Sequence, residues 1–357
     1  MEQILQELIK TTRYQLFHYP IYSKKDNIKY VIKRVLRPQN NPKRDSFFWT
    51  HAMLCQALET AGDLETVRKY FDLWIEKGQA VYNIDNVMNG YSLLYVYEQT
   101  KEEKYKQAAD KLYEYLLQYQ KEMKNTMPYR KHHPTHIYAD GLGMVVPFLC
   151  RYGKMFGKGE ATELGISLLK EFIEQSMDEN TGLPYHGYEF TTGVKYGIIG
   201  WGRAVGWLLL AMADSYEYLE EEQKNWLDKV YGMLLEKCMN YLREDGCFSW
   251  QLFAKEGPRD VGATAMIGYA LEKAVKLGVL QADCGAALEK KEHATIQDRC
   301  MVDSLCCKME QAILSSVKNG NIGDCSGECE GFSQYPQVYG AYPWSLGPGV
   351  RFLLIRK

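Results

Sequence analysis

Apolar side chains recur along this chain with the three- and four-residue spacing of α-helices, and the two-residue alternation of β-strands is nearly absent. The spacing predicts a succession of helices joined by mostly short connections. The predicted helices cover residues 47–60, 64–77, 84–99, 102–122, 140–157, 160–177, 203–219, 222–242, 260–276, 303–317 and 342–356. Short breaks such as Ala61-Gly62-Asp63 separate successive helices and indicate a series of helical hairpins.

The two helices of a predicted hairpin differ in polarity. Residues 207–213 read Trp-Leu-Leu-Leu-Ala-Met-Ala, so that helix is apolar on all sides, whereas residues 102–122 carry many charges. A helix that is apolar all round must be buried on both sides. We therefore expect an all-α toroid, in which apolar helices form an inner ring inside the charged ones, with a cleft at one end.

No linker rich in Pro, Gly or Ser divides the chain, so we expect a single domain over residues 1–357. Its irregular region is a charged, Cys-rich insertion around 281–330, of which 281–302 is poorly periodic. Most of the ten cysteines lie between Cys284 and Cys329. Because neither a secretory signal nor a zinc-site spacing accompanies them, we expect reduced thiols and no metal site.

Charge and hydropathy narrow the class of partner. Lys and Arg total 43 against 45 Asp and Glu, so the balance gives no reason to expect nucleic acid or an anionic membrane as partner. The amino terminus lacks the apolar core of a signal peptide, and no stretch approaches the roughly 20 apolar residues of a membrane span. We expect a cytoplasmic protein that binds a small molecule, and the sequence does not predict its oligomeric state.

Two aspartates are candidates for acid/base chemistry. Asp140 opens the apolar helix near 140–157, and Asp85 occupies the same position in the helix near 84–99. Two carboxylates at one end of a toroid would face one cleft, the arrangement that acid/base work on a glycosidic substrate needs. The alternative is that each carboxylate only caps its helix.

A histidine-rich run precedes Asp140 and contains His132, His133 and His136. Pro134 breaks any helical spacing across the run, and no Glu stands at a ligand-like offset. We therefore expect solvated or carbohydrate-contacting histidines in preference to a metal site.

The most distinctive segment is 201–207, which reads Trp-Gly-Arg-Ala-Val-Gly-Trp. The fork of Arg203 can hold a carboxylate through two hydrogen bonds, and Trp201 and Trp207 offer flat faces to a sugar. This equipment suits an anionic sugar, although a buried aromatic stripe beside a surface arginine is the alternative. His186, in Tyr-His-Gly-Tyr, would add a polar contact to an aromatic wall.

Taken in order, these motifs resemble the unsaturated rhamnogalacturonyl hydrolases of glycoside hydrolase family 105, which are close to the unsaturated glucuronyl hydrolases of family 88. The matching segments are Asp85 with residues 90–100, then 139–144 around Asp140, 185–187 around His186, and 201–207. The resemblance covers 45–280 and 340–357. The runs 131–136 and 281–330 match no family pattern and leave the leaving-group sugar open.

The resemblance implies an (α/α)6 barrel without metal or organic cofactor, and an oligosaccharide ending in an unsaturated uronic acid as substrate, most commonly linked to rhamnose. A protonated Asp140 would donate its proton to C4 of the C4=C5 double bond, and the same carboxylate would then activate water for C5. Burial and a nearby Asp85 would favour the protonated acid, whereas a helix amino terminus opposes it.

By the same resemblance, the residues expected to bind the substrate are His186, Trp201, Arg203 and Trp207, joined by His136 from the histidine run. Two other functions stay open at this point. One is a sugar epimerase, in which histidines would act as paired bases. The other is a non-catalytic glycan-binding barrel, because fold alone does not establish catalysis.

Overall fold

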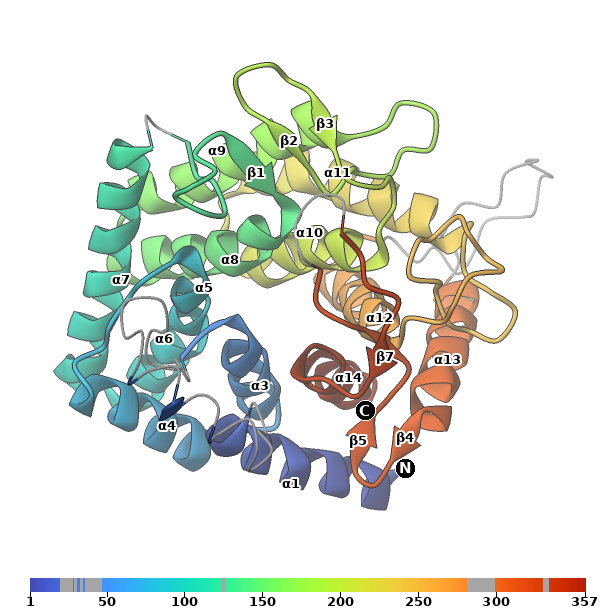
Figure 1. The fold of residues 1–357 in the computed structure, drawn as a ribbon, viewed down its shortest axis with the longest axis horizontal. Coiled ribbons are helices and arrows are strands. Elements are labelled where there is room, and N and C mark those ends of the chain that lie inside the picture. The colour runs from blue at the N-terminus through green and yellow to red at the C-terminus, as the bar shows by residue number, and fades with distance from the viewer. Residues whose placement is uncertain are drawn as a thin grey trace.

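The computed structural model describes residues 1–19, 28, 31–32, 35, 47–123, 126–280, 299–329 and 334–357. Its helices form two concentric rings (Figure 1). The inner helices are α3 (Trp49–Thr60), α6 (Asn89–Thr100), α8 (Ala139–Phe156), α10 (Gly202–Ser215), α12 (Val261–Leu277) and α14 (Pro343–Ile355). The outer helices are α1 (Glu2–His18), α4 (Leu64–Glu76), α7 (Glu103–Glu122), α9 (Gly159–Ser176), α11 (Glu221–Met239) and α13 (Arg299–Ser315).

The inner ring is closed. Helix α3 packs against α6, and the contacts continue through α8, α10, α12 and α14 back to α3. This arrangement is the predicted all-α fold, an (α/α)6 barrel. The buried core includes side chains from α1 through α14, whereas the assignment of residues 1–357 to a single domain stays a prediction.

Burial follows the polarity on which the toroid was predicted. Every residue of α10 is buried, as expected for a helix enclosed by neighbours on all sides. Helix α7 buries one stripe, which includes Tyr105, Ala109, Leu112 and Leu116, and exposes its charged face. The inner helices pack closely, because a Cβ added to Gly143 of α8 would lie 2.5 Å from the Trp207 ring of α10.

Two helical details differ from the sequence prediction. Helix α1 was not predicted, yet it buries Leu5, Leu8 and Leu16 against α3 and α14 and thereby completes the outer ring. The predicted helix 84–99 is divided into α5 (Ile84–Val87) and α6. Side chains cause this break, because the Asn86 and Asn89 amides donate to the carbonyl oxygen of Phe47 at 2.5 and 3.1 Å.

Short strands join the helices at one end of the barrel. Antiparallel β1 (His136–Tyr138), β2 (Gly187–Glu189) and β3 (Lys195–Tyr196) form one small sheet. Two further pairs, β4 (Val317–Lys318) with β5 (Asn321–Ile322) and β6 (Cys325–Ser326) with β7 (Tyr339–Gly340), belong to the segment between α13 and α14.

Residues 281–298 and 330–333 of the predicted Cys-rich insertion lie outside the described residues. The rest of that region contains α13 and the short strands β4 to β6. A search of the described helices finds none long and apolar enough to cross a membrane.

Candidate active site

The amino-terminal ends of the inner helices gather the candidate residues. Trp49 begins α3, Asp140 is the second residue of α8, and Arg203 is the second residue of α10. These three side chains line one cavity of about 290 Å³. The cavity therefore lies at the end of the barrel where these inner helices begin.

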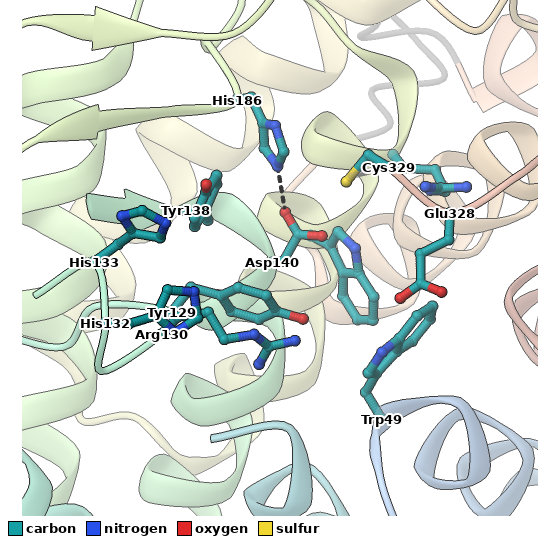
Figure 2. Close-up of a pocket in the computed structure, with 12 residues that line it drawn as sticks. Trp49, Tyr129, Arg130, His132, His133, Tyr138, Asp140, His186, Glu328 and Cys329 are labelled. Carbon is teal, nitrogen blue, oxygen red and sulfur yellow. Dashed lines mark hydrogen bonds and ion pairs between the residues drawn. The ribbon is translucent and has the colours of Figure 1, made fainter. Parts of the chain in front are cut away.

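The walls of this cavity come from five parts of the chain (Figure 2). These parts are the start of α3, residues 129–140, the residue before β2, residues 203–207 of α10, and the segment after β6. The lining residues are Trp49, Tyr129, Arg130, His132, His133, Tyr138, Asp140, His186, Arg203, Trp207, Glu328 and Cys329.

The register of the small sheet brings Asp140 and His186 together. Strand β1 leads directly into α8, Tyr138 pairs with Gly187, and the Ala139 amide donates to the His186 carbonyl at 3.0 Å. As a result the side chains meet, with His186 Nε2 2.9 Å from Asp140 Oδ2. The Asp140 side chain is 13% exposed and that of His186 is 2% exposed.

His186 is fixed from its other side as well. Its Nδ1 lies 2.9 Å from the hydroxyl of Tyr335, and its ring packs edge-on against Trp201 and beside Tyr138. Tyr335 comes from the segment between α13 and α14, so residues distant in sequence hold one imidazole. This arrangement gives the ring little freedom to turn away from Asp140.

Asp85 lies behind the cavity wall and is not among the lining residues. It is the second residue of α5 and is 7% exposed, and Arg130 Nη1 donates to its Oδ2 at 2.7 Å. Burial raises the pKa of Asp85, and the negative charge of Asp140 adds to this effect, while Arg130 opposes it. The charge of Asp140 therefore acts on Asp85, and Arg130 pairs with Asp85 while lining the cavity itself.

Neither aspartate acts as a helix cap. Tyr138 occupies the N-cap position of α8, and Asn83 occupies that of α5. The alternative interpretation of Asp85 and Asp140 as capping residues is therefore wrong.

Arg203 is buried and connects α10 to the segment after α13. Its Nη1 donates to the carbonyl oxygens of Ser326 and Gly327 at 2.6 and 2.7 Å, and its guanidinium lies over the Trp201 ring. Within the described parts of the chain, its hydrogen bonds all run through Nη1. The surface-arginine alternative is wrong, because Arg203 is only 3% exposed.

The remaining predicted binding residues separate into two groups. Trp207 lines the cavity and meets Trp49 edge-on, with ring centroids 5.7 Å apart. Trp201 and His136 do not line it: Trp201 packs behind His186, and the His136 ring stacks on His133 with centroids 5.0 Å apart. His136 is thus connected to the cavity through His133.

Several residues at the cavity or directly behind it were not predicted. Tyr129 and Arg130 directly precede the histidine run, so their position was the available sequence signal. Glu328, Cys329 and Tyr335 follow β6, and nothing in the sequence indicates that this segment returns to the barrel end. Figure 2 shows Glu328 across the cavity from His133. Desolvation at the cavity raises the pKa of the Glu328 carboxyl, and the negative charges of Asp85 and Asp140 add to this effect, while Arg203 and Arg130 oppose it.

Comparisons with known proteins agree with this geometry. Residues 27–312 match the family described as Glycosyl Hydrolase Family 88, so the chain belongs to this family and is a glycosidase. It is an unsaturated glycoside hydrolase of the family 88 and family 105 type. This membership favours a hydrolase over the epimerase and the non-catalytic glycan-binding barrel.

Individual relatives support the same assignment. The chain is 25% identical over 239 residues to the unsaturated rhamnogalacturonyl hydrolase YesR of Bacillus subtilis strain 168, an overlap of 64% of this chain and 69% of that protein. A possible family 105 member from Klebsiella pneumoniae superposes with a TM-score of 0.81 at 17% identity, over 99% of this chain and 93% of the other. An unsaturated glucuronyl hydrolase specific for heparin gives a TM-score of 0.67 at 15% identity, over 100% of this chain and 97% of the other. These two structural similarities show that this chain shares the fold of both proteins.

Proposed function

We propose that this protein releases an unsaturated uronic acid from the non-reducing end of rhamnogalacturonan disaccharides. The observation that carries the proposal is the Asp140–His186 pair, 2.9 Å apart at the wall of a small aromatic cavity. The similarity to YesR supports rhamnose as the leaving sugar. The cavity of about 290 Å³ is near the lower end of ligand sites, roughly 300 Å³, and suits one sugar ring better than a long chain.

The charges around the cavity suit an anionic sugar. The inner helices that begin there direct the positive ends of their dipoles toward it, and Arg130 and Arg203 line its walls. In the proposal Arg203 faces the uronate carboxylate, and Trp49 and Trp207 enclose the ring. Trp201 and His136 act from behind the wall through His186 and His133. His132 and His133, which lie across the cavity from Glu328, would contact the leaving sugar.

The reaction begins with proton transfer from the Asp140 carboxyl to C4 of the unsaturated ring. The π electrons of C4=C5 form the new C4–H bond, and the positive charge left at C5 is shared with the ring oxygen. Water then adds to C5 and returns a proton to Asp140. His186, hydrogen-bonded to Oδ2, orients the carboxyl group for both transfers.

The glycosidic bond breaks after this hydration. The hemiketal at C5 opens to a ketone, which cleaves the bond between C5 and the ring oxygen. The hemiacetal thereby formed at C1 expels the second sugar as an alcohol and leaves an aldehyde. Asp85 stays behind the cavity wall, where its ion pair with Arg130 holds that arginine side chain at the cavity.

The substrate part of the proposal is tested by comparing unsaturated disaccharides with different second sugars. Loss of the ultraviolet absorbance of the conjugated double bond gives kcat/KM for each. We expect the highest value with rhamnose and an unsaturated galacturonyl group. A higher value with an unsaturated glucuronyl substrate linked to an amino sugar would contradict the proposed specificity and keep the hydrolase assignment.

A further inference from the structure

The catalytic pair has a third neighbour that the proposed reaction does not use. The Cys329 sulfur, a His186 ring nitrogen and an Asp140 carboxylate oxygen all lie within 4.8 Å of one another. Figure 2 shows the Cys329 sulfur beside the Asp140–His186 pair. All three residues line the cavity.

These three groups match the ligand preferences of zinc. Zn²⁺ binds thiolate sulfur, imidazole nitrogen and carboxylate oxygen at about 2.0–2.3 Å, most often in a tetrahedron. Two ligands of such a tetrahedron lie roughly 3.3–3.7 Å apart. The Nε2 to Oδ2 distance is 2.9 Å and the whole group spans at most 4.8 Å, so side-chain adjustments of about 1 Å would complete the geometry.

The surroundings support metal ligation by His186. Its Nδ1 lies 2.9 Å from the Tyr335 hydroxyl, and in the tautomer in which Nδ1–H donates to that oxygen the Nε2 lone pair is available to a metal. Glu328 adds negative charge to the same cavity, whereas Arg130 and Arg203 oppose a cation there. A thiolate ligand favours Zn²⁺ over the hard cations Mg²⁺ and Ca²⁺.

We infer that Asp140, His186 and Cys329 form a binding site for a thiophilic divalent cation, with Zn²⁺ as the best match, and that the bound cation inhibits the enzyme. On binding, the Cys329 thiol and the Asp140 carboxyl release their protons to solvent, zinc bonds form to sulfur, nitrogen and oxygen, and zinc-bound waters leave. A fourth position of the tetrahedron would be left for a water. Inhibition rests on the proposed function, because a metal-bound Asp140 cannot carry the proton for C4. Binding does not rest on it.

Cobalt tests the binding part directly. Full-length protein treated with chelator is titrated with Co²⁺, whose bond to a thiolate produces a sulfur-to-cobalt charge-transfer band in the near ultraviolet. We expect this band at one equivalent in the wild type, its loss in Cys329→Ser, and its retention in Cys300→Ser, which removes an exposed thiol on α13. No band in the wild type, or an unchanged band in Cys329→Ser, would overturn the proposal. Cys329→Ala provides a second variant if Cys329→Ser does not fold by circular dichroism.

Zinc affinity and inhibition are measured separately. Competition with a chromogenic chelator should show Zn²⁺ binding at least about 10-fold weaker in Cys329→Ser and in Asp140→Asn, consistent with loss of one ligand. Binding should tighten as pH rises, because it releases protons. Zn²⁺ should inhibit the wild type, and chelator should restore activity. If Zn²⁺ binds and activates, the inhibitory role is wrong. If the protein cleaves no unsaturated disaccharide, the proposed function fails while the cobalt result still decides the site.

Discussion

His186 Nε2 lies 2.9 Å from Asp140 Oδ2, while His186 Nδ1 lies 2.9 Å from the hydroxyl of Tyr335. Tyr335, His186 and Asp140, which lie far apart in sequence, thus form one chain of hydrogen bonds that ends at the cavity. Because the imidazole is buried and held at both nitrogens, it controls the orientation of the Asp140 carboxyl group. We therefore regard Tyr335 as a positioning residue that acts through His186.

Tyr335→Phe tests this positioning. Loss of one hydrogen bond, worth about 0.5–1.5 kcal/mol, should lower kcat by roughly 2- to 10-fold and leave KM nearly unchanged. The pH profile of kcat should also shift, since the partner of His186 has changed. The control is Tyr339→Phe, because Tyr339 donates to Gln337 outside the cavity. Equal effects of both variants, or a change confined to KM, would contradict the assigned role.

The ion pair between Arg130 and Asp85 should contribute to stability as well as to the site. Arg130→Leu leaves Asp85 buried without its cation, a change that costs roughly 3–5 kcal/mol in fully buried pairs. Because the Arg130 side chain is 29% exposed, we expect a smaller loss of about 1–3 kcal/mol in the free energy of unfolding near neutral pH. Urea denaturation measures it, and Asp85→Asn in the Arg130→Leu background should recover part of the loss.

The Arg130–Asp85 ion pair should also make the free energy of unfolding depend on pH. The pKa of Asp85 is raised in the fold, chiefly by burial, so the proton on Asp85 stabilises the fold and this contribution is lost as pH rises through the folded pKa. Removal of Arg130 raises that pKa further. The destabilisation of Arg130→Leu should therefore shrink in mildly acidic solution, and a loss that grows on acidification would contradict this account.

Close packing between α8 and α10 should make Gly143 intolerant of a side chain. A Cβ there would lie 2.5 Å from the Trp207 ring and 2.9 Å from the Trp207 carbonyl oxygen. We expect Gly143→Ala to cost about 1–3 kcal/mol and to weaken substrate binding, because Trp207 lines the cavity. Gly159→Ala is the matched control, since no atom lies within 4 Å of its added Cβ, and it should be neutral or stabilising by up to about 1 kcal/mol. Thermal denaturation compares the two.

Glu189, at the end of β2, should titrate at unusually low pH. Hydrogen bonds from Thr135 and Thr192 lower its pKa from 4.5 to about 2. The resulting stabilisation is present above the ordinary pKa and is lost as pH falls toward about 2. Carboxyl ¹³C NMR should place the midpoint near 2, and Thr192→Val should raise it. A midpoint near 4.5 in the wild type would show that these hydrogen bonds do not persist in solution.

The sequence predicted most of the barrel because its signal is local. Apolar residues on all sides of 202–215 require enclosure, and that requirement alone indicates an inner helix. The break between α5 and α6 was not predictable in this way, because Asn86 and Asn89 act on the distant carbonyl of Phe47. Local patterns do not reveal such tertiary partners.

The residues of the site were likewise predictable only where a local motif marked them. Asp140, His186, Arg203 and Trp207 were predicted from motifs, and the structure places all four at one cavity. Glu328, Cys329 and Tyr335 belong to a segment whose sequence carries no periodicity and whose position depends on contacts such as that of Arg203 with Ser326. Their part in the site could be found only from the fold.

The most direct test of the account uses two disaccharides that share one leaving sugar and differ only in the C4=C5 double bond. Release of that sugar is measured for the wild type and for Asp140→Asn, with folding checked by circular dichroism. We predict release by the wild type from the unsaturated substrate alone, and a rate at least about 10²-fold lower in Asp140→Asn. Comparable release from the saturated substrate, or near-normal activity of Asp140→Asn, would contradict hydration of the double bond by Asp140.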